Sequence, residues 1–299
     1  MFRKIIIPTE ASAAAMELLK HVSGLHDLGT REVLLLECSG CCETDAVSAN
    51  FVDSVLKGNI ISQKEMLEDQ GFIVETRITK GLPETEINRI AISEDFSMIV
   101  TGAQKHILSG EIFFGGLAYD IIHYAQKPVL IIRLNDEDGK VGKPAAAGSP
   151  LCRHILFPTD FSENAAAAFE YLKFSVIKGA GKVTLLHVHD KEMFDSLTPD
   201  QILEFSKKDM EKLQNMQLAL QDQSDIEINV VLSEGSPAEE ILKKIRELDV
   251  SLVVMGSQGK GYIKELFVGS VSRQIARHSD SSVMLIPMIR SEENSVEKE

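Results

Sequence analysis

Glycine and hydroxyl residues near the C-terminus have the types and spacing that a phosphate-binding loop needs. Gly256 and Gly259 are followed, after nine residues, by Gly269 and Ser270. Gly256 would let a ligand approach the backbone closely, and we expect Gly259 to adopt a positive φ in the turn. At a predicted helix start, the backbone N–H groups of Gly269 and Ser270 would attract an anion through hydrogen bonds and the helix dipole. The hydroxyl of Ser272, about one turn further on, could add a donor.

Two lysines lie in the loop between these glycine pairs. Lys260 and Lys264 could supply positive charge to a bound phosphate. The chain contains neither the Walker pattern G-x-x-x-x-G-K-[ST] nor G-x-G-x-x-G. Judged from these residues alone, a phosphate-binding loop and a tight turn before a capped helix are equally well supported.

The elements around this loop are those of a parallel α/β sheet, in which short apolar runs alternate with longer amphipathic segments. Continuous apolar runs such as 252–255 suit strands that are covered on both faces. Ligands bind such sheets at the carboxyl ends of the strands, which here are the residues after 159, 188 and 256. In the second half of the chain we expect strands at 154–159, 183–189, 226–232, 251–256 and 283–287, and helices at 163–179, 200–222, 237–247 and 270–278.

The second half of the chain repeats the first. The matching segments are 5–10 with 155–160, 33–36 with 183–186, 81–83 with 235–237 and 129–132 with 283–286. One short insertion reconciles all of them, which predicts two copies of one domain, each a doubly wound, mostly parallel five-stranded α/β sheet. We expect a first copy at 1–134, a linker at 135–150, a second copy at 151–290 and a polar tail at 291–299.

The glycine pattern and its surroundings resemble a known family. The spacing G-x2-G-x9-G-[ST] is similar to the nucleotide signature of the universal stress protein family. Three further segments match that family: Pro158-Thr159-Asp160-x-Ser162, Leu185-Leu186-His187-Val188 and Gly235-x-Pro237. Because the likeness covers both copies, the chain resembles a tandem universal stress protein. This implies two domains of the adenine-nucleotide alpha-hydrolase-like type.

The resemblance also implies which residues of the second copy contact a nucleotide. The four signature residues Gly256, Gly259, Gly269 and Ser270 would bind the phosphates and ribose. Asp160 would contact the ribose or adenine side, and the backbone at Val188 would meet the adenine. The implied ligand is ATP, ADP or AMP, with or without Mg²⁺. The candidate set is completed by neighbours of these residues: Pro158, Thr159, Met255, Val271 and Ser272.

Asp160 and Ser162 have a second interpretation. Both precede a predicted helix, and both residue types are preferred at the N-terminal cap of a helix. A capping role and a ligand-binding role therefore remain open for this segment.

The first copy departs from the signature. Gly102 keeps the first glycine, but Lys105 replaces the second, and Gly116 replaces the hydroxyl residue. Lys105 carries a Cβ, so a positive φ there would be strained. Glu10, one methylene longer, stands where the second copy has Asp160. Backbone N–H groups stay usable, yet we favour a structural partner domain over a second nucleotide site.

Three crowded cysteines lie just after a predicted strand of the first copy. Cys38, Cys41 and Cys42 form C-x-x-C-C, which could be a redox pair or a soft-metal site. A tetrahedral zinc site needs four ligands, and no second C-x-x-C or H-x-x-x-H accompanies this cluster; Cys152 is the only other thiol. We therefore favour an ordinary reduced loop and keep a redox or metal sensor as an alternative function.

His187 and His189 lie near the candidate site on a predicted strand. We expect their side chains to point to opposite faces of the sheet, so that they do not easily chelate one metal. One of them could border the adenine pocket, although a strand-end histidine that touches solvent is the simpler interpretation. We assign no metal ligand in the chain.

Bulk composition narrows the class of partner. The 299 residues are 44% hydrophobic and carry a formal net charge of −14. This charge disfavours nucleic acid or an anionic membrane as the main partner, and no apolar stretch is long enough to span a membrane. Because the N-terminus lacks a signal-peptide pattern, we expect a cytoplasmic protein.

Taken together with these residues, the resemblance implies an adenine-nucleotide-binding regulatory protein of the stress response. A slow ATP hydrolase is the alternative, but no carboxylate–histidine pair stands at the phosphate end, so we assign no catalytic residue. The resemblance also implies that the last strands of the two copies, 129–132 and 283–286, pair within the chain, which would cover two exposed edges. A further homodimer of such chains is compatible with this arrangement.

Overall fold

The computed structural model describes residues 1–10, 12–39, 46–105, 112–113, 116–134, 151–194, 197–259 and 268–288. The predicted linker and tail lie outside these described residues, as do Gly115, Cys41, Cys42, Lys260 and Lys264. Among the described helices, none combines the length and apolar character that crossing a bilayer requires.

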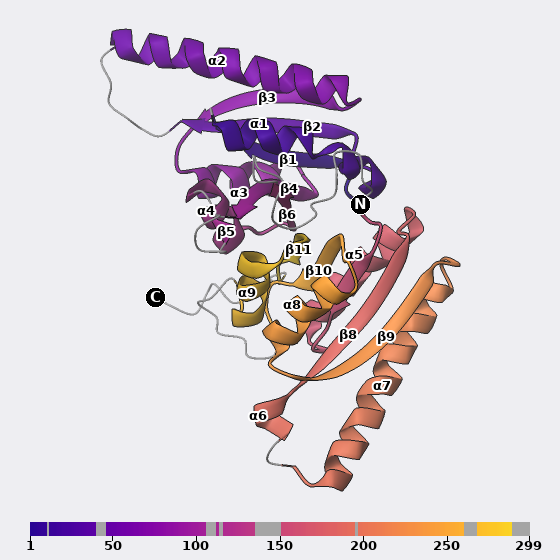
Figure 1. The fold of residues 1–299 in the computed structure, drawn as a ribbon. Helices are drawn as coiled ribbons and strands as arrows, with labels where there is room; N and C mark the ends of the chain where they lie inside the picture. Colours follow the sequence, from indigo (N-terminus) through magenta and orange to yellow (C-terminus); the bar gives the residue numbers. More distant parts are fainter. Residues whose placement is uncertain are drawn as a thin grey trace.

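The first copy alternates strands and helices along the chain (Figure 1). Its elements are β1 (Lys4–Thr9), α1 (Ala13–Lys20), the 3-10 helix η1 (Ser23–Leu28), β2 (Glu32–Ser39), α2 (Ala46–Asp69), β3 (Ile73–Lys80), α3 (Pro83–Ser93), β4 (Met98–Lys105), β5 (Ile112–Phe113), α4 (Gly116–Tyr124) and β6 (Val129–Leu134).

The second copy follows the same order, and the strands and helices predicted for it are confirmed with ends shifted by a few residues at most. Local signals explain the helix starts: Ser162 caps α5, Thr198 forms a capping box with Gln201, and Pro237 opens α8. The elements are β7 (Ile155–Pro158), α5 (Glu163–Ile177), β8 (Lys182–Asp190), α6 (Lys191–Phe194), α7 (Pro199–Gln221), β9 (Glu227–Gly235), α8 (Pro237–Glu247), β10 (Leu252–Gly256), α9 (Ser270–His278) and β11 (Ser282–Ile286).

The two copies share one continuous sheet. Its strand order is β3-β2-β1-β4-β6-β11-β10-β7-β8-β9, with β5 attached to β4 as a hairpin. Neighbours within each copy's five main strands are parallel, whereas β6 and β11 are antiparallel. The predicted α/β class is confirmed, with five doubly wound, parallel strands in each copy, but the two sets of strands join into one sheet. Because the joining strands are antiparallel, the carboxyl ends of the two copies' strands point in opposite directions.

The junction between the copies is buried and partly polar. Met284 pairs with Leu130 at the centre of the β6–β11 contact, so the expected pairing of the last strands within one chain is confirmed. Arg133 of β6 reaches the C-terminal end of α9, where its guanidinium donates to the carbonyls of Ser279 (2.9 Å) and Ala276. A cation at a helix C-terminus is favourable because the exposed carbonyls and the helix dipole are negative there.

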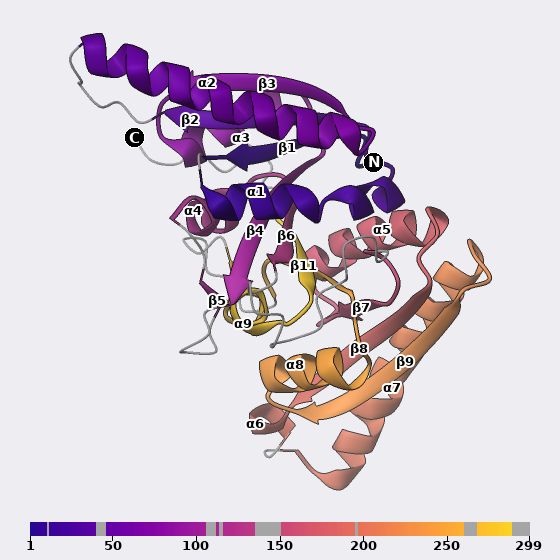
Figure 2. The ribbon, with the colours of Figure 1, turned by 45° about the horizontal axis from the view of Figure 1, so that its top comes forward.

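Two apolar cores cover the two faces of the shared sheet, and each extends across both copies. One core lies beneath α1, η1, α2, α5 and α7, and the other lies beneath α3, α4, α8 and α9. Figure 2 shows α1 and α2 lying across one face of the first-copy strands. Strands buried on both faces account for the continuous apolar runs in the sequence.

The copies also match in unusual backbone angles. Asp95 and Asp249 follow equivalent helices, and their φ angles are 51° and 50°. Gly81 and Gly235, at equivalent strand ends, have φ angles of 140° and 147°. A positive φ is uncommon for a residue with a side chain, so these shared values show that both copies are built on one detailed backbone plan.

Candidate functional site

The carboxyl ends of β7, β8 and β10 lie at one edge of the second-copy sheet. β7 stands between β8 and β10, and the chain leaves β7 toward β8 but returns on the other side at β10. This reversal is the switch point at which doubly wound sheets bind ligands. Thr159 and Asp160 follow β7, and the glycine loop that begins at Gly256 ends β10. The topology therefore brings together two of the segments that the sequence singled out.

A buried asparagine that sequence reasoning missed holds the glycine loop in place. Asn164, in the first turn of α5, is only 3% exposed. Its Oδ1 accepts a 2.9 Å hydrogen bond from the N–H of Gln258, and its Nδ2 donates to the carbonyl of Ile286 at 3.1 Å. One side chain thus connects α5, the loop after β10 and the end of β11. The available signal was a single amide residue preceding the run of alanines at 165–168.

Close packing requires the two glycines of this loop. A Cβ on Gly256 would lie 2.6 Å from Oδ1 of Asn164, and a Cβ on Gly259 would lie 2.7 Å from Oδ2 of Asp160. Among the described glycines with a positive φ, Gly259 does not appear. The expectation of a positive φ at Gly259 was therefore wrong. The residue is needed because any side chain would collide with the Asp160 carboxylate.

The N-terminus of α9 lies beside the same loop. Gly269 is its N-cap residue, and the N–H of Gly269 donates to the carbonyl of Ser257 at 2.7 Å. The N–H groups of Ser270 and Val271 belong to the first helical turn, where no acceptor exists within the helix; such groups bind anions readily. The hydroxyl of Ser272 is buried and donates to the carbonyl of Ser257 at 2.5 Å. Ser272 thus stabilises the loop from the inside, which differs from its expected role as a donor to ligand.

Asp160 and Ser162 perform the capping role that was left open. Oδ1 of Asp160 accepts a 3.0 Å hydrogen bond from the N–H of Ser162, and Oγ of Ser162 accepts one of 3.2 Å from the N–H of Ala165. These bonds fix the start of α5. Oδ1 of Asp160 is thus engaged by the N–H of Ser162, and the other carboxylate oxygen, Oδ2, lies against Gly259.

Four other predicted residues bring mainly peptide groups to this edge. Pro158 is the last residue of β7, and Oγ1 of Thr159 accepts a hydrogen bond from the N–H of Phe161 at 3.0 Å. The side chain of Met255 is buried in the core beneath α8 and α9, and that of Val188 packs against the same core. The contact of the Val188 backbone with adenine stays a prediction.

The corresponding edge of the first copy is built differently. Oγ1 of Thr9 donates to Oε1 of Gln63 at 2.6 Å, and Nε2 of Gln63 donates to the carbonyl of Glu10 at 3.3 Å. Lys105 continues β4 in an extended conformation and pairs with Ile112 of β5. The strained positive φ considered for Lys105 therefore does not occur, because a hairpin extends the strand beyond the point at which β10 ends.

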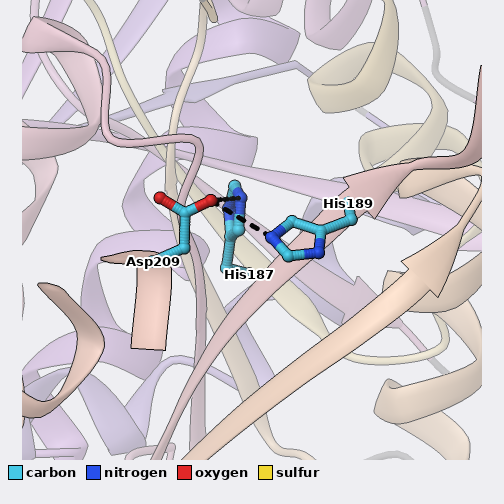
Figure 3. A group of neighbouring side chains, drawn as sticks. All are labelled: His187, His189 and Asp209. Atoms are coloured by element: carbon cyan, nitrogen blue, oxygen red, sulfur yellow. Dashed lines mark hydrogen bonds and ion pairs between the residues drawn. The ribbon is translucent and has the colours of Figure 1, made fainter. Parts of the chain in front are cut away.

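His187 and His189 lie on the same face of β8, so the expectation of opposite faces was wrong. Side chains alternate along a strand with a period of two, and residues two apart therefore share a face. Figure 3 shows both imidazoles directed at the carboxylate of Asp209 on α7. The Nε2 atoms of His187 and His189 lie 3.5 Å and 3.1 Å from Oδ2 of Asp209, respectively.

Asp209 is ionised more readily than an ordinary aspartic acid. Burial raises the pKa of Asp209, but hydrogen bonds from Lys212 and His189 and the electrostatic interactions with His187 and Lys212 outweigh burial and hold that pKa below its usual range. Lys212 binds the other carboxylate oxygen, with Nζ 2.7 Å from Oδ1. The cluster therefore presents a carboxylate oxygen to two imidazole nitrogens.

Comparison with known proteins gives two matches to one family profile. The profile of the universal stress protein family matches residues 1–133 and 152–287. A universal stress protein of Methanocaldococcus jannaschii is 30% identical over 161 residues, which cover 46% of this chain and 96% of that protein.

Solved structures of the family show the same fold. A universal stress protein from Archaeoglobus fulgidus covers 95% of this chain and 97% of its own, with a TM-score of 0.72 at 22% identity. A universal stress protein in complex with cAMP matches 44% of this chain at 12% identity and a TM-score of 0.34, which is too distant to bear on the ligand of this chain.

The profile matches fall on both halves of the chain, and the two halves share strand order, apolar cores and unusual backbone angles. The chain therefore belongs to the universal stress protein family and carries two universal stress protein domains.

Proposed function

We propose that the second copy binds an adenine nucleotide, ATP, ADP or AMP, and that occupancy of this site regulates the protein in a stress response. The observation that carries the proposal is the packing of Gly256 and Gly259 against Asn164 and Asp160. This packing fixes a loop with two glycines next to the first-turn N–H groups of α9. Such an edge suits a ligand that combines phosphates with hydroxyl groups.

The roles follow from the chemistry of each position. The phosphates lie at the N-terminus of α9, where the N–H groups of Ser270 and Val271 and the helix dipole favour negative charge. Oδ2 of Asp160 accepts hydrogen bonds from the ribose hydroxyls, since a carboxylate is an acceptor only. The peptide of Val188 meets the adenine. No catalytic residue is required for this function.

Isothermal titration of the whole protein with ATP, ADP, AMP and cAMP, each with and without Mg²⁺, tests the proposal. The informative variant is Gly269→Ala. A Cβ there would make only ordinary contacts of 3.5 Å with Ser257 and Ser272, so the fold tolerates it, but the methyl group stands at the anion-binding helix end. We expect nucleotide affinity to fall at least about tenfold, which corresponds to about 1.4 kcal/mol.

The matched control is Gly58→Ala on α2, where a Cβ would meet nothing within 4 Å; it should bind as the wild type does. Absence of binding by all four nucleotides would refute the proposal, as would unchanged affinity in Gly269→Ala. Phosphate release measured in the same samples separates stable binding from slow hydrolysis.

A further inference from the structure

The His187–His189–Asp209 cluster lies outside the set of residues that the proposed function uses. The two histidines come from neighbouring same-face positions of β8, and Asp209 faces them from α7. The relative exposures of His187, His189 and Asp209 are 8%, 6% and 9%. One ligand-type atom from each residue lies within 4.8 Å of the other two. Three potential metal ligands are therefore gathered in a largely buried space (Figure 3).

The separations fit a small divalent cation. In a tetrahedral zinc site with bonds of about 2.0–2.1 Å, donor atoms lie about 3.3 Å apart. Here the two imidazole Nε2 atoms are 3.5 Å and 3.1 Å from Oδ2 of Asp209. Two imidazole nitrogens and one carboxylate oxygen suit Zn²⁺ and similar first-row cations, whereas Mg²⁺ and Ca²⁺ prefer all-oxygen sites.

Hydrogen bonding fixes the orientation of His187 as it does in known metal sites. Nδ1 of His187 lies 2.7 Å from the carbonyl of Thr159. A carbonyl only accepts, so Nδ1 carries a proton, and Nε2 is directed at Oδ2 of Asp209. Metal-bound histidines commonly donate their second N–H to a carbonyl or carboxylate, which sets the tautomer.

The surroundings restrain the other two residues. The ring of Phe194 stacks on His189 with centroids 4.2 Å apart, and Lys212 holds Oδ1 of Asp209 at 2.7 Å. Oδ2 is then the oxygen that both histidines share. Ligands that are already oriented lose little conformational freedom when an ion binds, which favours affinity.

We propose that His187, His189 and Asp209 bind one divalent cation of the Zn²⁺ class through Nε2, Nε2 and Oδ2. Three protein ligands leave a fourth coordination position for water or an exogenous donor. The histidine pair is particular to the second copy, because the matching strand positions of the first copy hold Glu37 and Ser39. The proposed cation site does not depend on the proposed nucleotide site, although the Thr159 carbonyl connects the two.

The test is titration of chelator-treated full-length protein with Zn²⁺ and with Co²⁺. We expect one ion per chain by elemental analysis, and a Co²⁺ visible spectrum of tetrahedral intensity without thiolate charge-transfer bands. Asp209→Asn keeps the side-chain volume, and His189→Ala removes one ring. Each should weaken binding by more than about 100-fold, since loss of an outer partner alone costs about 10–100-fold.

Two controls guard against other ligands and against misfolding. His278→Ala removes an imidazole outside the cluster, and Cys41→Ser/Cys42→Ser removes two thiols that could bind Zn²⁺ elsewhere; both variants should bind Zn²⁺ like the wild type. If Asp209→Asn fails to fold, the Cys41→Ser/Cys42→Ser protein still decides, because Zn²⁺ must raise its Tm and a chelator must reverse the rise. A protein that retains no Zn²⁺, or whose affinity is unchanged in Asp209→Asn and His189→Ala, would overturn the proposal and leave a hydrogen-bonded cluster.

Discussion

The two copies use the same backbone plan, yet their carboxyl edges are held together by different chemistry. Ser12 and Ser162 cap equivalent helices. Two residues further on, the second copy has Asn164 and the first has Ala14. In the second copy Asn164 binds the glycine loop. The first copy has no amide at this position, so it cannot make the same connection.

The glycine that both copies retain has different neighbours. A Cβ on Gly256 would meet the amide of Asn164, whereas a Cβ on Gly102 would lie 2.9 Å from Cδ1 of Leu134. Gly102 is therefore retained for apolar packing and Gly256 for a polar connection. A shared signature glycine therefore does not establish a shared ligand site; the two edges differ in the polar side chain that hydrogen-bonds to the loop.

The largest expected effect separates these two glycines directly. In Gly256→Ala the new methyl group collides with the side chain and backbone of Asn164. We expect a loss of about 3 kcal/mol in the free energy of unfolding, the upper range for overpacking, together with loss of nucleotide binding. In Gly102→Ala the nearest atom is the flexible end of Leu134, so the cost should stay near about 1 kcal/mol.

Urea denaturation and nucleotide titration of both variants provide the measurement. Equal destabilisation of Gly256→Ala and Gly102→Ala would contradict the proposed difference in packing between the two copies, because it would mean that the two edges are packed alike.

Exchanging Asn164 and Ala14, the residues that differ between the two copies at this position, should have a smaller effect on stability and nucleotide affinity. Asn164→Ala leaves the buried N–H of Gln258 and the carbonyl of Ile286 without this partner, which should cost about 2 kcal/mol. Nucleotide affinity should fall about tenfold, since the loop is no longer fixed. The reciprocal change Ala14→Asn, on an exposed site, should alter stability by less than about 0.5 kcal/mol.

Calorimetric titration measures the nucleotide affinity of both variants, and urea denaturation measures their stability. If Ala14→Asn created a nucleotide site in the first copy, the absence of the amide would be the whole difference between the edges. We expect no such gain, because Lys105 and the β4–β5 hairpin also differ.

Local sequence patterns predict much of this fold. Apolar runs and caps such as Ser162 and Thr198 predicted the strands and helices of the second copy. The internal repeat predicted two domains, and the family resemblance predicted that they pair through β6 and β11. Signals of this kind depend on neighbouring or regularly spaced residues, so they can be recognised without knowledge of the tertiary structure.

The site itself was only partly predictable. The signature glycines were found, but the reason for Gly259 was not, because its close neighbour Asp160 is distant in sequence. Asn164 and Asp209 were missed for the same reason: each contacts residues that only the fold brings near. The prediction that His187 and His189 point to opposite faces was wrong for a different reason: residues two apart on a strand share a face.

The smallest effect concerns reactivity near the carboxyl end of each copy's second strand, β2 or β8. The first copy has the thiol of Cys38 at this position and the second copy has Val188. Burial, assisted by the negative charges of Glu86, Glu37 and Glu84, raises the pKa of Cys38 to about 11. The thiolate is the reactive form. Cys38 should therefore alkylate slowly at neutral pH, and its rate should rise about tenfold per pH unit until the pH approaches its pKa.

The measurement is the alkylation rate against pH in a Cys41→Ser/Cys42→Ser/Cys152→Ser variant, with the urea-unfolded protein as control. On unfolding, the thiol regains an ordinary pKa of about 8.5, so the folded and unfolded profiles should separate most at neutral pH. Rapid labelling of the folded protein near pH 7 would contradict this and revive the redox interpretation. A slow rate would mean that Cys38, like Val188, serves the strand end by packing rather than by chemistry.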